Sequence, residues 1–360
     1  MNFPKRTLVA LASLATATGA LSQSSVTLFG VLDTSVAHIR SAGTDVTGLS
    51  SGGESSSRFG IRGVEDLGAG LKAGFWLESG IGVDTGTGSG RDDRLSFDRR
   101  STASLSSRNW GELRLGRDKT PAYLNIETFD PFGDIGVGGY GGQNLIGGTT
   151  TAVGTPEGSN PKRASNGLQY LLPDTLGGLY GQVLYAFGEQ GSGVPNDRLR
   201  DAAALRAGYK RGPVDLGFGY GQIRGGTTAA GVDYRSSNVG AAYDFGVVKP
   251  MVLFATERGN GRRVDLLGVG VIVPFGKGEF RASFSSFRRK DIDDADSTKL
   301  ALGYGYDLSK RTQVYGTFAR VRNDAAATRG LAVSSSALAT PAVNAGAGVT
   351  GFELGVRHSF

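Results

Sequence analysis

Apolar and polar residues alternate along most of the chain with a period of two. Residues 214–221 carry an apolar side chain at every second position, separated by Asp215 and three glycines, and the same alternation recurs in residues 71–78, 279–285 and 352–360. Successive side chains of a β-strand point to opposite faces of the sheet. The pattern therefore predicts β-strands that each have one apolar and one polar face.

The connections between these segments are of two kinds. The segments are roughly 9–13 residues long, which suits a tilted strand that crosses a bilayer and exceeds the usual length of strands in soluble proteins. Seven connections are short turns, at 65–68, 107–109, 173–177, 211–213, 245–246, 274–277 and 307–310. Eight are longer and polar, at about 39–54, 84–95, 118–162, 189–199, 225–231, 258–262, 290–295 and 323–348. Together they predict about sixteen strands.

Short turns at one end and long loops at the other are typical of an outer-membrane β-barrel. Closure pairs every backbone N–H and C=O within lipid, and about sixteen strands leave an aqueous channel. We therefore expect an all-β, 16-stranded antiparallel transmembrane β-barrel. The alternative is a soluble secreted adhesin built from β-sandwiches, whose strands would alternate in the same way. That protein would pack its apolar faces into a core.

The N-terminal residues 1–22 have the pattern of a secretory signal peptide. Two basic residues, Lys5 and Arg6, precede a short apolar run, and a small-x-small cleavage site ends at Ser22. A membrane-anchoring helix is disfavoured, because the run is too short to cross ~30 Å of hydrocarbon. The sequence predicts cleavage after Ser22 and a mature chain, residues 23–360, that forms one barrel domain in the bacterial outer membrane.

Composition excludes several classes of site. The 360 residues contain no Cys and only two His, so a disulfide scaffold, a Cys-ligated metal and a multi-histidine centre are not expected, and no cofactor is predicted. Glycine accounts for 59 residues. In a barrel this excess serves turns that need a positive φ and inward positions that keep the lumen open. The net charge of +6 comes without a basic stripe that contains interleaved aromatics, so nucleic-acid binding is not expected.

Sequence motifs for enzymatic chemistry are weak. Residues 48–52 match G-x-S-x-G around Ser50, but no helical pattern follows, and His38 and His358 lie on predicted strands. An esterase is therefore disfavoured, and the protein is not expected to be an enzyme. The acidic residues in 291–296 could bind a divalent cation, although they lack the spacing of a calcium loop and a solvated loop is the favoured interpretation.

Several segments resemble one family, the general porins of Gram-negative bacteria, and their anion-selective branch most closely. They are QSSVTLFG at 23–30, SRFGIRGVEDLG at 57–68, FDRRST at 97–102, LRLGR at 113–117 and GVRHSF at 355–360. The resemblance implies a homotrimer in outer-membrane lipid and lipopolysaccharide that passes small anionic or neutral polar solutes by diffusion. It also implies that Phe360 is the signal read by the barrel-assembly machinery. A substrate-specific channel of the same fold, for phosphate, an organic acid or a sugar, is the alternative.

The connection at 118–162 is long enough to be functional. Thr120 followed by Pro121 predicts a short helix with Thr as N-cap and Pro at its first position. Length alone favours an external loop. The resemblance instead implies that this is the third loop, which folds inward and constricts the pore.

The resemblance also implies a charged constriction. It matches a basic cluster on the wall that faces the loop to Arg58, Arg99 and Arg163, and acidic members to Glu78 and Asp130. Secondary candidates are Arg62, Arg100, Glu127 and Asp134. Alternation with neighbouring apolar residues would point Arg100 inward instead of Arg99, and both alternatives stay open. Guanidinium is always charged and weakly hydrated, and fixed positive charge selects anions where the pore is no wider than the ~8 Å screening length.

Overall fold

The computed structural model describes residues 25–88, 96–141, 162–188, 190–195, 197–199, 201–226, 231–259, 261–333 and 338–360. These residues form eighteen strands and one helix. The elements are β1 (Ser25–Ser41), β2 (Thr44–Ser51), β3 (Arg58–Gly68), β4 (Leu71–Gly82), β5 (Thr87–Gly88), β6 (Arg100–Ser107), β7 (Gly111–Lys119), α1 (Pro121–Thr128), β8 (Arg163–Leu171), β9 (Leu179–Ala186), β10 (Ala202–Arg211), β11 (Val214–Gly226), β12 (Gly231–Tyr243), β13 (Lys249–Gly259), β14 (Arg262–Phe275), β15 (Gly278–Arg289), β16 (Ser297–Asp307), β17 (Thr312–Asn323) and β18 (Val349–Ser359). The predicted signal peptide, residues 1–22, lies outside the described residues.

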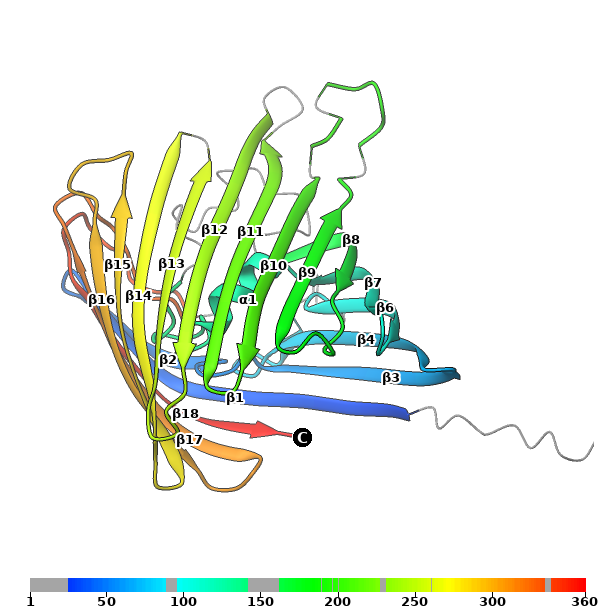
Figure 1. Cartoon of the computed structure of the whole chain (residues 1–360). Helices are drawn as coiled ribbons and strands as arrows, with labels where there is room; N and C mark the ends of the chain where they lie inside the picture. Colours follow the sequence, from blue (N-terminus) through cyan, green and yellow to red (C-terminus); the bar gives the residue numbers. More distant parts are fainter. Residues whose placement is uncertain are drawn as a thin grey trace, which may run out of the picture.

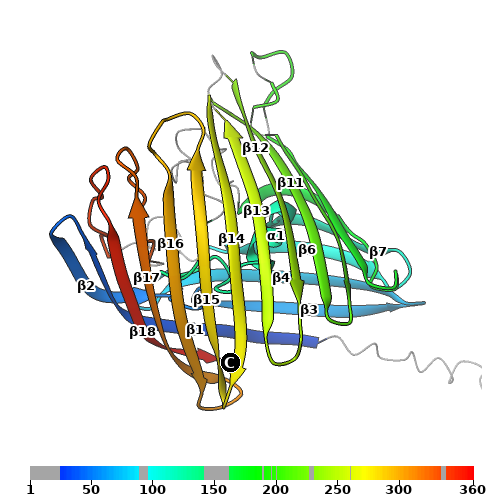
Figure 2. The same ribbon diagram turned by 60° about the vertical axis from the view of Figure 1, so that its left-hand side comes forward.

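The strands form one antiparallel sheet that closes on itself. Sequence neighbours pair around the wall, and β18 pairs with β1 from Val31 opposite Ser359 to Ser41 opposite Val349. Strands β9–β16 run between the short turns at the bottom of Figure 1 and a second set of connections at the top. Figure 2 shows the same wall from another side. Among the described residues, no helix is long and apolar enough to span a bilayer.

Sixteen positions make up the wall, as the sequence predicts. Strands β2 and β3 lie end to end along β1: β2 pairs with its later half and β3 with Ser25–Val31. Strand β5 is a two-residue ribbon that pairs only with the end of β4. Because β2 and β3 share one position and β5 stands apart, eighteen strands give sixteen wall positions.

The prediction of a long loop at about 39–54 is wrong. Strand β1 continues to Ser41, and a two-residue turn at Ala42 and Gly43 leads directly into β2. Both turn residues have positive φ, 50° and 82°, which is the requirement of a type I′ hairpin turn. Ser50 of the G-x-S-x-G match lies buried within β2, without the strand-turn-helix context of a nucleophile elbow.

The apolar faces of the strands point outward. Leu216 and Phe218 of β11, Val239 of β12 and Phe254 of β13 are each exposed by more than two fifths. Their neighbours on the other face, such as Asn238, are buried in the interior. An apolar outer belt is the arrangement of a lipid-facing barrel and the reverse of what the adhesin alternative predicts.

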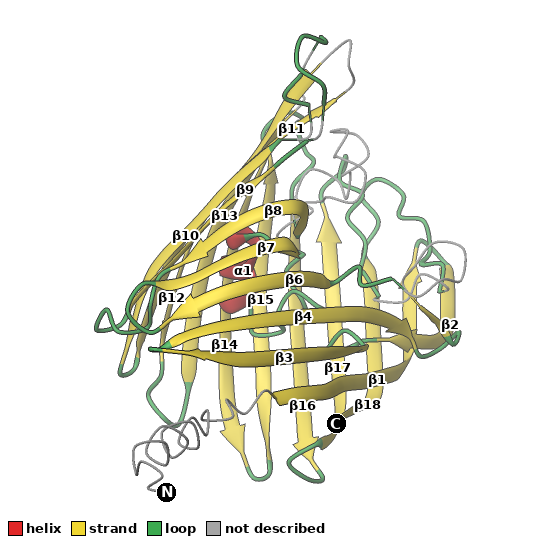
Figure 3. Ribbon diagram, turned by 90° about the vertical axis from the view of Figure 1, so that its right-hand side faces the viewer, coloured by secondary structure: helices red, strands yellow, loops and turns green. Residues whose placement is uncertain are grey.

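The interior holds helix α1, which begins as the sequence predicts. The Thr120 side chain accepts a hydrogen bond from the Tyr123 N–H, and Pro121 is the first helical residue. Figure 3 shows the helix inside the ring of strands, where it contacts β10, β11 and β12. Asn238 Nδ2 donates to the Ala122 carbonyl and Asn125 Nδ2 donates to Asn238 Oδ1, which fixes the helix to the wall.

Glycines on the inner face provide the room for this loop. A Cβ at Gly240 of β12 would overlap the Phe129 ring, and a Cβ at Gly270 of β14 would overlap Pro131. The prediction that inward glycines keep the lumen open therefore needs a correction. At these positions they let the inserted loop lie directly against the wall.

We expect Gly240→Ala to push Phe129 away from the wall and into the lumen, and so to lower single-channel conductance in planar bilayers. Gly74→Ala is the matched control, because its Cβ would meet Ser104 and the Gly63 carbonyl but no residue of the loop. Equal conductance for the two variants would contradict this role of Gly240.

Candidate functional site

A cluster of arginines surrounds one carboxylate on the inner wall. Arg99 Nε lies 2.7 Å from Glu78 Oε1, and Arg58 Nε lies 3.7 Å from the same oxygen. Trp76 Nε1 donates to Glu78 Oε2 (3.1 Å), and Arg163 Nε donates to the Arg99 carbonyl (3.0 Å). The three predicted arginines and Glu78 thus lie together, although they come from β3, β4, the residue before β6, and β8.

Both Arg99 and Arg100 take part. Arg100 stands opposite Glu78 in the β4–β6 register, and its guanidinium lies 4.4 Å from the Trp76 ring centroid. Arg99 precedes the strand, and its backbone N–H donates to the Glu78 carbonyl. Strand alternation does not yet apply to Arg99, so two consecutive arginines both reach the cavity: Arg99 pairs with Glu78, and Arg100 Nε lies 3.4 Å from Asp118 Oδ2. The guanidinium of the secondary candidate Arg62 lies 5.0 Å from the centroid of the same ring.

Two basic residues near this cluster, Arg117 and Lys119, could not be identified from alternation along the sequence. Arg117 Nη1 donates to Ser165 Oγ (2.7 Å), and Lys119 Nζ donates to Glu127 Oε1 (2.7 Å). The register of β7 shifts between Gly116 and Asp118, and Gly116 has a φ of 118°. This bulge breaks the alternation on which the sequence analysis depends. A glycine next to an arginine within a strand, as at Gly116 and Arg117, is the sequence signal that could have revealed this bulge.

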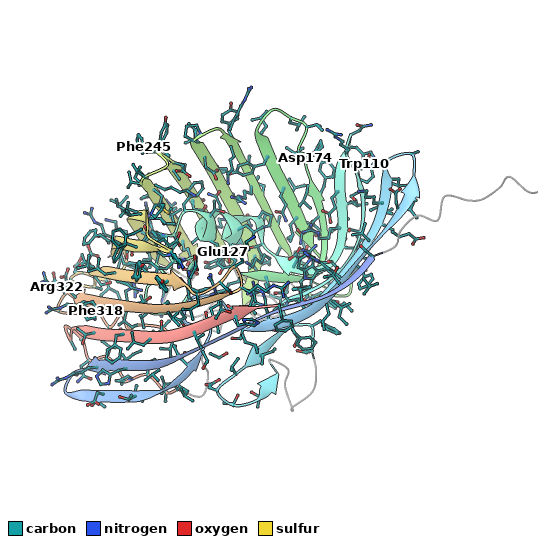
Figure 4. All side chains as sticks on the ribbon, turned by 90° about the horizontal axis from the view of Figure 1, so that it is seen from below. Trp110, Glu127, Asp174, Phe245, Phe318 and Arg322 are labelled. Carbon is teal, nitrogen blue, oxygen red and sulfur yellow. The ribbon has the colours of Figure 1, made fainter. Side chains whose placement is uncertain are left out.

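A cavity of about 1150 Å³ inside the barrel is lined by Arg58, Trp76, Glu78, Arg99, Arg100, Lys119 and Arg163. The arginine wall forms one side of the cavity, and Tyr123, Glu127 and Asp134 of the inserted loop form another. In Figure 4 Glu127 lies within the ring of strands, whereas Phe318 and Arg322 lie at its outer edge. Glu127 is paired with Lys119, and the Asp134 carboxylate lies 3.8 Å from Lys162 Nζ.

Asp130 is not at the pore wall, which corrects its predicted place. Its carboxylate is enclosed within the loop, where Oδ1 accepts from the Phe132 N–H and Oδ2 accepts from the Asp134 and Tyr140 N–H groups. Burial and the neighbouring Asp134 raise the pKa of this carboxyl to about 7. Asp130 therefore holds the turn after α1 together and does not face a passing solute.

The balance of charge favours a positive wall. Glu78 interacts with both Arg58 and Arg99, and no other carboxylate contacts these two arginines in the described part of the chain. Arg163 lies close enough to Arg99 for the two charges to repel each other. A fixed charge of this kind acts on ions that pass within the screening length, so the wall can attract anions and repel cations.

A closed barrel with a polar cavity, an inserted loop and a fixed charged wall defines a diffusion channel. The chain belongs to the Gram-negative porin family, whose family model matches residues 7–326. It is 37% identical to outer membrane porin protein 32 of Delftia acidovorans, over 99% of this chain and 100% of that protein. It is 30% identical to an outer membrane porin protein of Bordetella pertussis, over 88% of this chain and 94% of that protein.

Solved structures give the same result. The anion-selective porin from Comamonas acidovorans has a TM-score of 0.84 and 35% identity, and the match covers 94% of this chain and 100% of that chain. The trimer form of OmpT of Vibrio cholerae has a TM-score of 0.65 at 17% identity, with 94% of this chain and 99% of that chain covered, which shows a common fold.

Glu78→Gln keeps the shape of the side chain and removes its charge. We expect the preference for anions to increase, because Arg58 and Arg99 then lack their counter-charge. One unit charge ~5 Å from a passing ion is worth about 0.8 kcal/mol in water, or roughly fourfold in permeability ratio. The reversal potential under a KCl gradient measures this change. Asp174→Asn, which removes a carboxylate from an exposed short turn between β8 and β9, is the control. A weaker anion preference in Glu78→Gln would contradict the prediction.

Proposed function

We propose that the protein is a general-diffusion porin of the outer membrane that passes small hydrophilic solutes and ions and prefers anions. The observation that carries the proposal is the cluster of Arg58, Arg99 and Arg163 at the cavity wall, where Arg58 and Arg99 share the carboxylate of Glu78. The anion-selective porin from Comamonas acidovorans, which is similar along nearly its whole length, supports the charge preference.

Each part of the constriction has a separate task in this proposal. The inserted loop limits the size of the solute, because it occupies the lumen opposite the arginine wall. The arginines replace part of the hydration of a passing anion with their N–H donors. Glu78 holds Arg58 and Arg99 in place, and by offsetting part of their charge it keeps anion binding weak enough for release. Arg62 and Arg100, whose guanidinium groups both lie near the Trp76 ring, extend the positive wall toward the short-turn end.

The decisive experiment is planar-bilayer recording of detergent-purified protein under a KCl gradient. We expect Cl⁻ to be more permeant than K⁺, and Arg99→Gln and Arg163→Gln each to lower the permeability ratio by about fourfold at low salt. High salt should reduce the difference, since it screens the wall. Arg322→Gln, on the outer face, is the control.

Three outcomes are distinguishable. A cation preference in the wild type would overturn the proposed selectivity. Conductance that saturates at low concentrations of phosphate, an organic acid or a sugar would favour the substrate-specific channel instead. Absence of any channel would overturn the porin function.

Assembly follows from the same proposal. We infer a homotrimer, for which the trimer form of the similarly folded OmpT is the supporting precedent. Phe360 exchanges both backbone hydrogen bonds with Gly30, and its side chain stays 44% exposed. We infer that this terminal residue is the signal read by the barrel-assembly machinery. Export would use the signal peptide of residues 1–22, and N-terminal sequencing of the mature protein should begin at Gln23.

We propose that three arginines on the outer face of the barrel contact lipopolysaccharide in the outer leaflet. Arg235, Arg258 and Arg263 stand directly opposite one another on β12, β13 and β14, at the end of these strands away from the short turns. The outer two each pair with an aspartate on their own strand, and Arg258 between them contacts no carboxylate among the described residues. Like charges in this arrangement repel each other, unless a further anion lies between them. Phosphate groups of lipopolysaccharide would supply that anion above the apolar belt.

The double substitution Arg258→Gln and Arg263→Gln should reduce the lipopolysaccharide that copurifies with the protein, because it removes two of the three opposed charges. Phosphate and hydroxy-fatty-acid analysis of the purified protein measures the amount of bound lipopolysaccharide. Lys310→Gln, in a short turn, should leave the amount unchanged. Equal lipid content in both variants would overturn this contact.

A further inference from the structure

A second loop borders the same cavity as the constriction. Residues 326–333, between β17 and β18, line it together with Arg58 and Glu78. Leu331 is buried in the same apolar cluster as Ile39 of β1 and Val137 of the inserted loop. Residues 326–333 of the 324–348 loop therefore form part of the pore wall, and Leu331 anchors them to the interior.

The base of this loop has an ordered structure. Asn323 Nδ2 donates to the carbonyls of Arg329 (3.0 Å) and Ala347 (2.7 Å), and Asn323 Oδ1 accepts from the Arg329 N–H (3.2 Å). One side chain thus ties both ends of the loop together. It also fixes the direction in which Arg329 leaves the backbone.

Arg329 reaches from this loop to the inserted loop. Its Nη2 donates to the Tyr140 carbonyl (2.8 Å), and its guanidinium lies 3.1 Å from the centroid of the Phe287 ring on β15. No carboxylate lies within hydrogen-bonding distance of Arg329 among the described residues, and Nη1 has no partner there. Burial lowers the pKa of the guanidinium to about 9, and the charge of Asp134 opposes this shift. Such a charge is costly to bury, so its contacts must hold it in place.

Two other contacts hold the same end of the inserted loop. Glu353 Oε2 on β18 accepts from the Val137 N–H (2.9 Å), and Lys299 Nζ on β16 donates to the Gly139 carbonyl. Both come from strands of the wall. Arg329 differs because it belongs to a loop, and its contact with Tyr140 joins the two loops to each other and to Phe287.

We propose that Arg329 is a positioning residue that clamps the 324–348 loop to the end of the inserted loop and thereby sets the size limit of the pore. Cation–π stacking on Phe287 fixes the guanidinium plane, and the bond to the Tyr140 carbonyl transmits that position to the constriction. Without the clamp, both loops can move apart, and the cavity that they share becomes wider. The inference rests on the channel function proposed above and not on its charge preference.

The test compares Arg329→Met, Arg329→Lys and the outer-face control Arg322→Met in planar bilayers and in liposome swelling with sugars of increasing size. We expect Arg329→Met to raise single-channel conductance and open-channel noise and to admit sugars that the wild type excludes. Arg329→Lys should restore much of the wild-type limit, because it keeps a cation for Phe287 and a donor for Tyr140. Arg322→Met should match the wild type.

Heat-modifiable migration in SDS gels establishes that each barrel is folded. If Arg329→Met does not fold, Phe287→Leu provides the second test, since it removes the stacking surface and leaves the bond to Tyr140. Wild-type conductance, noise and size limit in a folded Arg329→Met, or in Phe287→Leu if that substitution is needed, would overturn the clamp. So would a wider pore that Arg329→Lys fails to narrow.

The outcomes that test the Arg329 clamp can be distinguished from the outcomes that test the proposed function. A wild type without anion preference, in which Arg329→Met still widens the pore, would refute the selectivity and retain the clamp. A wild type that forms no channel would refute both.

Discussion

The close approach of the inserted loop to the inner wall is the constraint on which the lumen depends. Because Gly240 and Gly270 have no side chain, Phe129 and Pro131 pack directly against the backbone of β12 and β14. Helix α1 is then fixed by amide hydrogen bonds to Asn238. The space left over is the cavity in which the arginine wall faces the loop. A side chain at either glycine would change the shape of the whole channel.

Within that space, the arginines and the inserted loop are held by different groups. The arginines are held by Glu78, by backbone carbonyls and by the Trp76 ring, all of which belong to the wall. The loop is held by Asp130 within itself and by Glu353, Lys299 and Arg329 at its far end. Because the two sets share few contacts, a substitution in one should leave the other largely intact.

Alternation and the lengths of the connections were sufficient to predict the barrel and about sixteen wall positions, and the pair Thr120–Pro121 was sufficient to predict the start of α1. It failed wherever the backbone leaves regular strand geometry. The bend before β6 lets Arg99 pair with Glu78 while Arg100 pairs with Asp118, and the bulge at Gly116 displaces Arg117. Asp130 was misplaced for another reason: a carboxylate in a loop can bind its own backbone, and no residue pattern separates that role from a place at the pore.

Closure between β1 and β18 also determines when folding can finish. The pairing joins Val31 to Ser359, and the final residue, Phe360, completes the ladder with Gly30. These contacts span nearly the full length of the chain, and pairing at such separation is intrinsically slow. The first strand therefore keeps an unpaired edge until the last residues have been synthesised and exported. During that interval the open edge of β1 can pair with a strand of another chain, which exposes the protein to edge-to-edge aggregation until Phe360 closes the ladder.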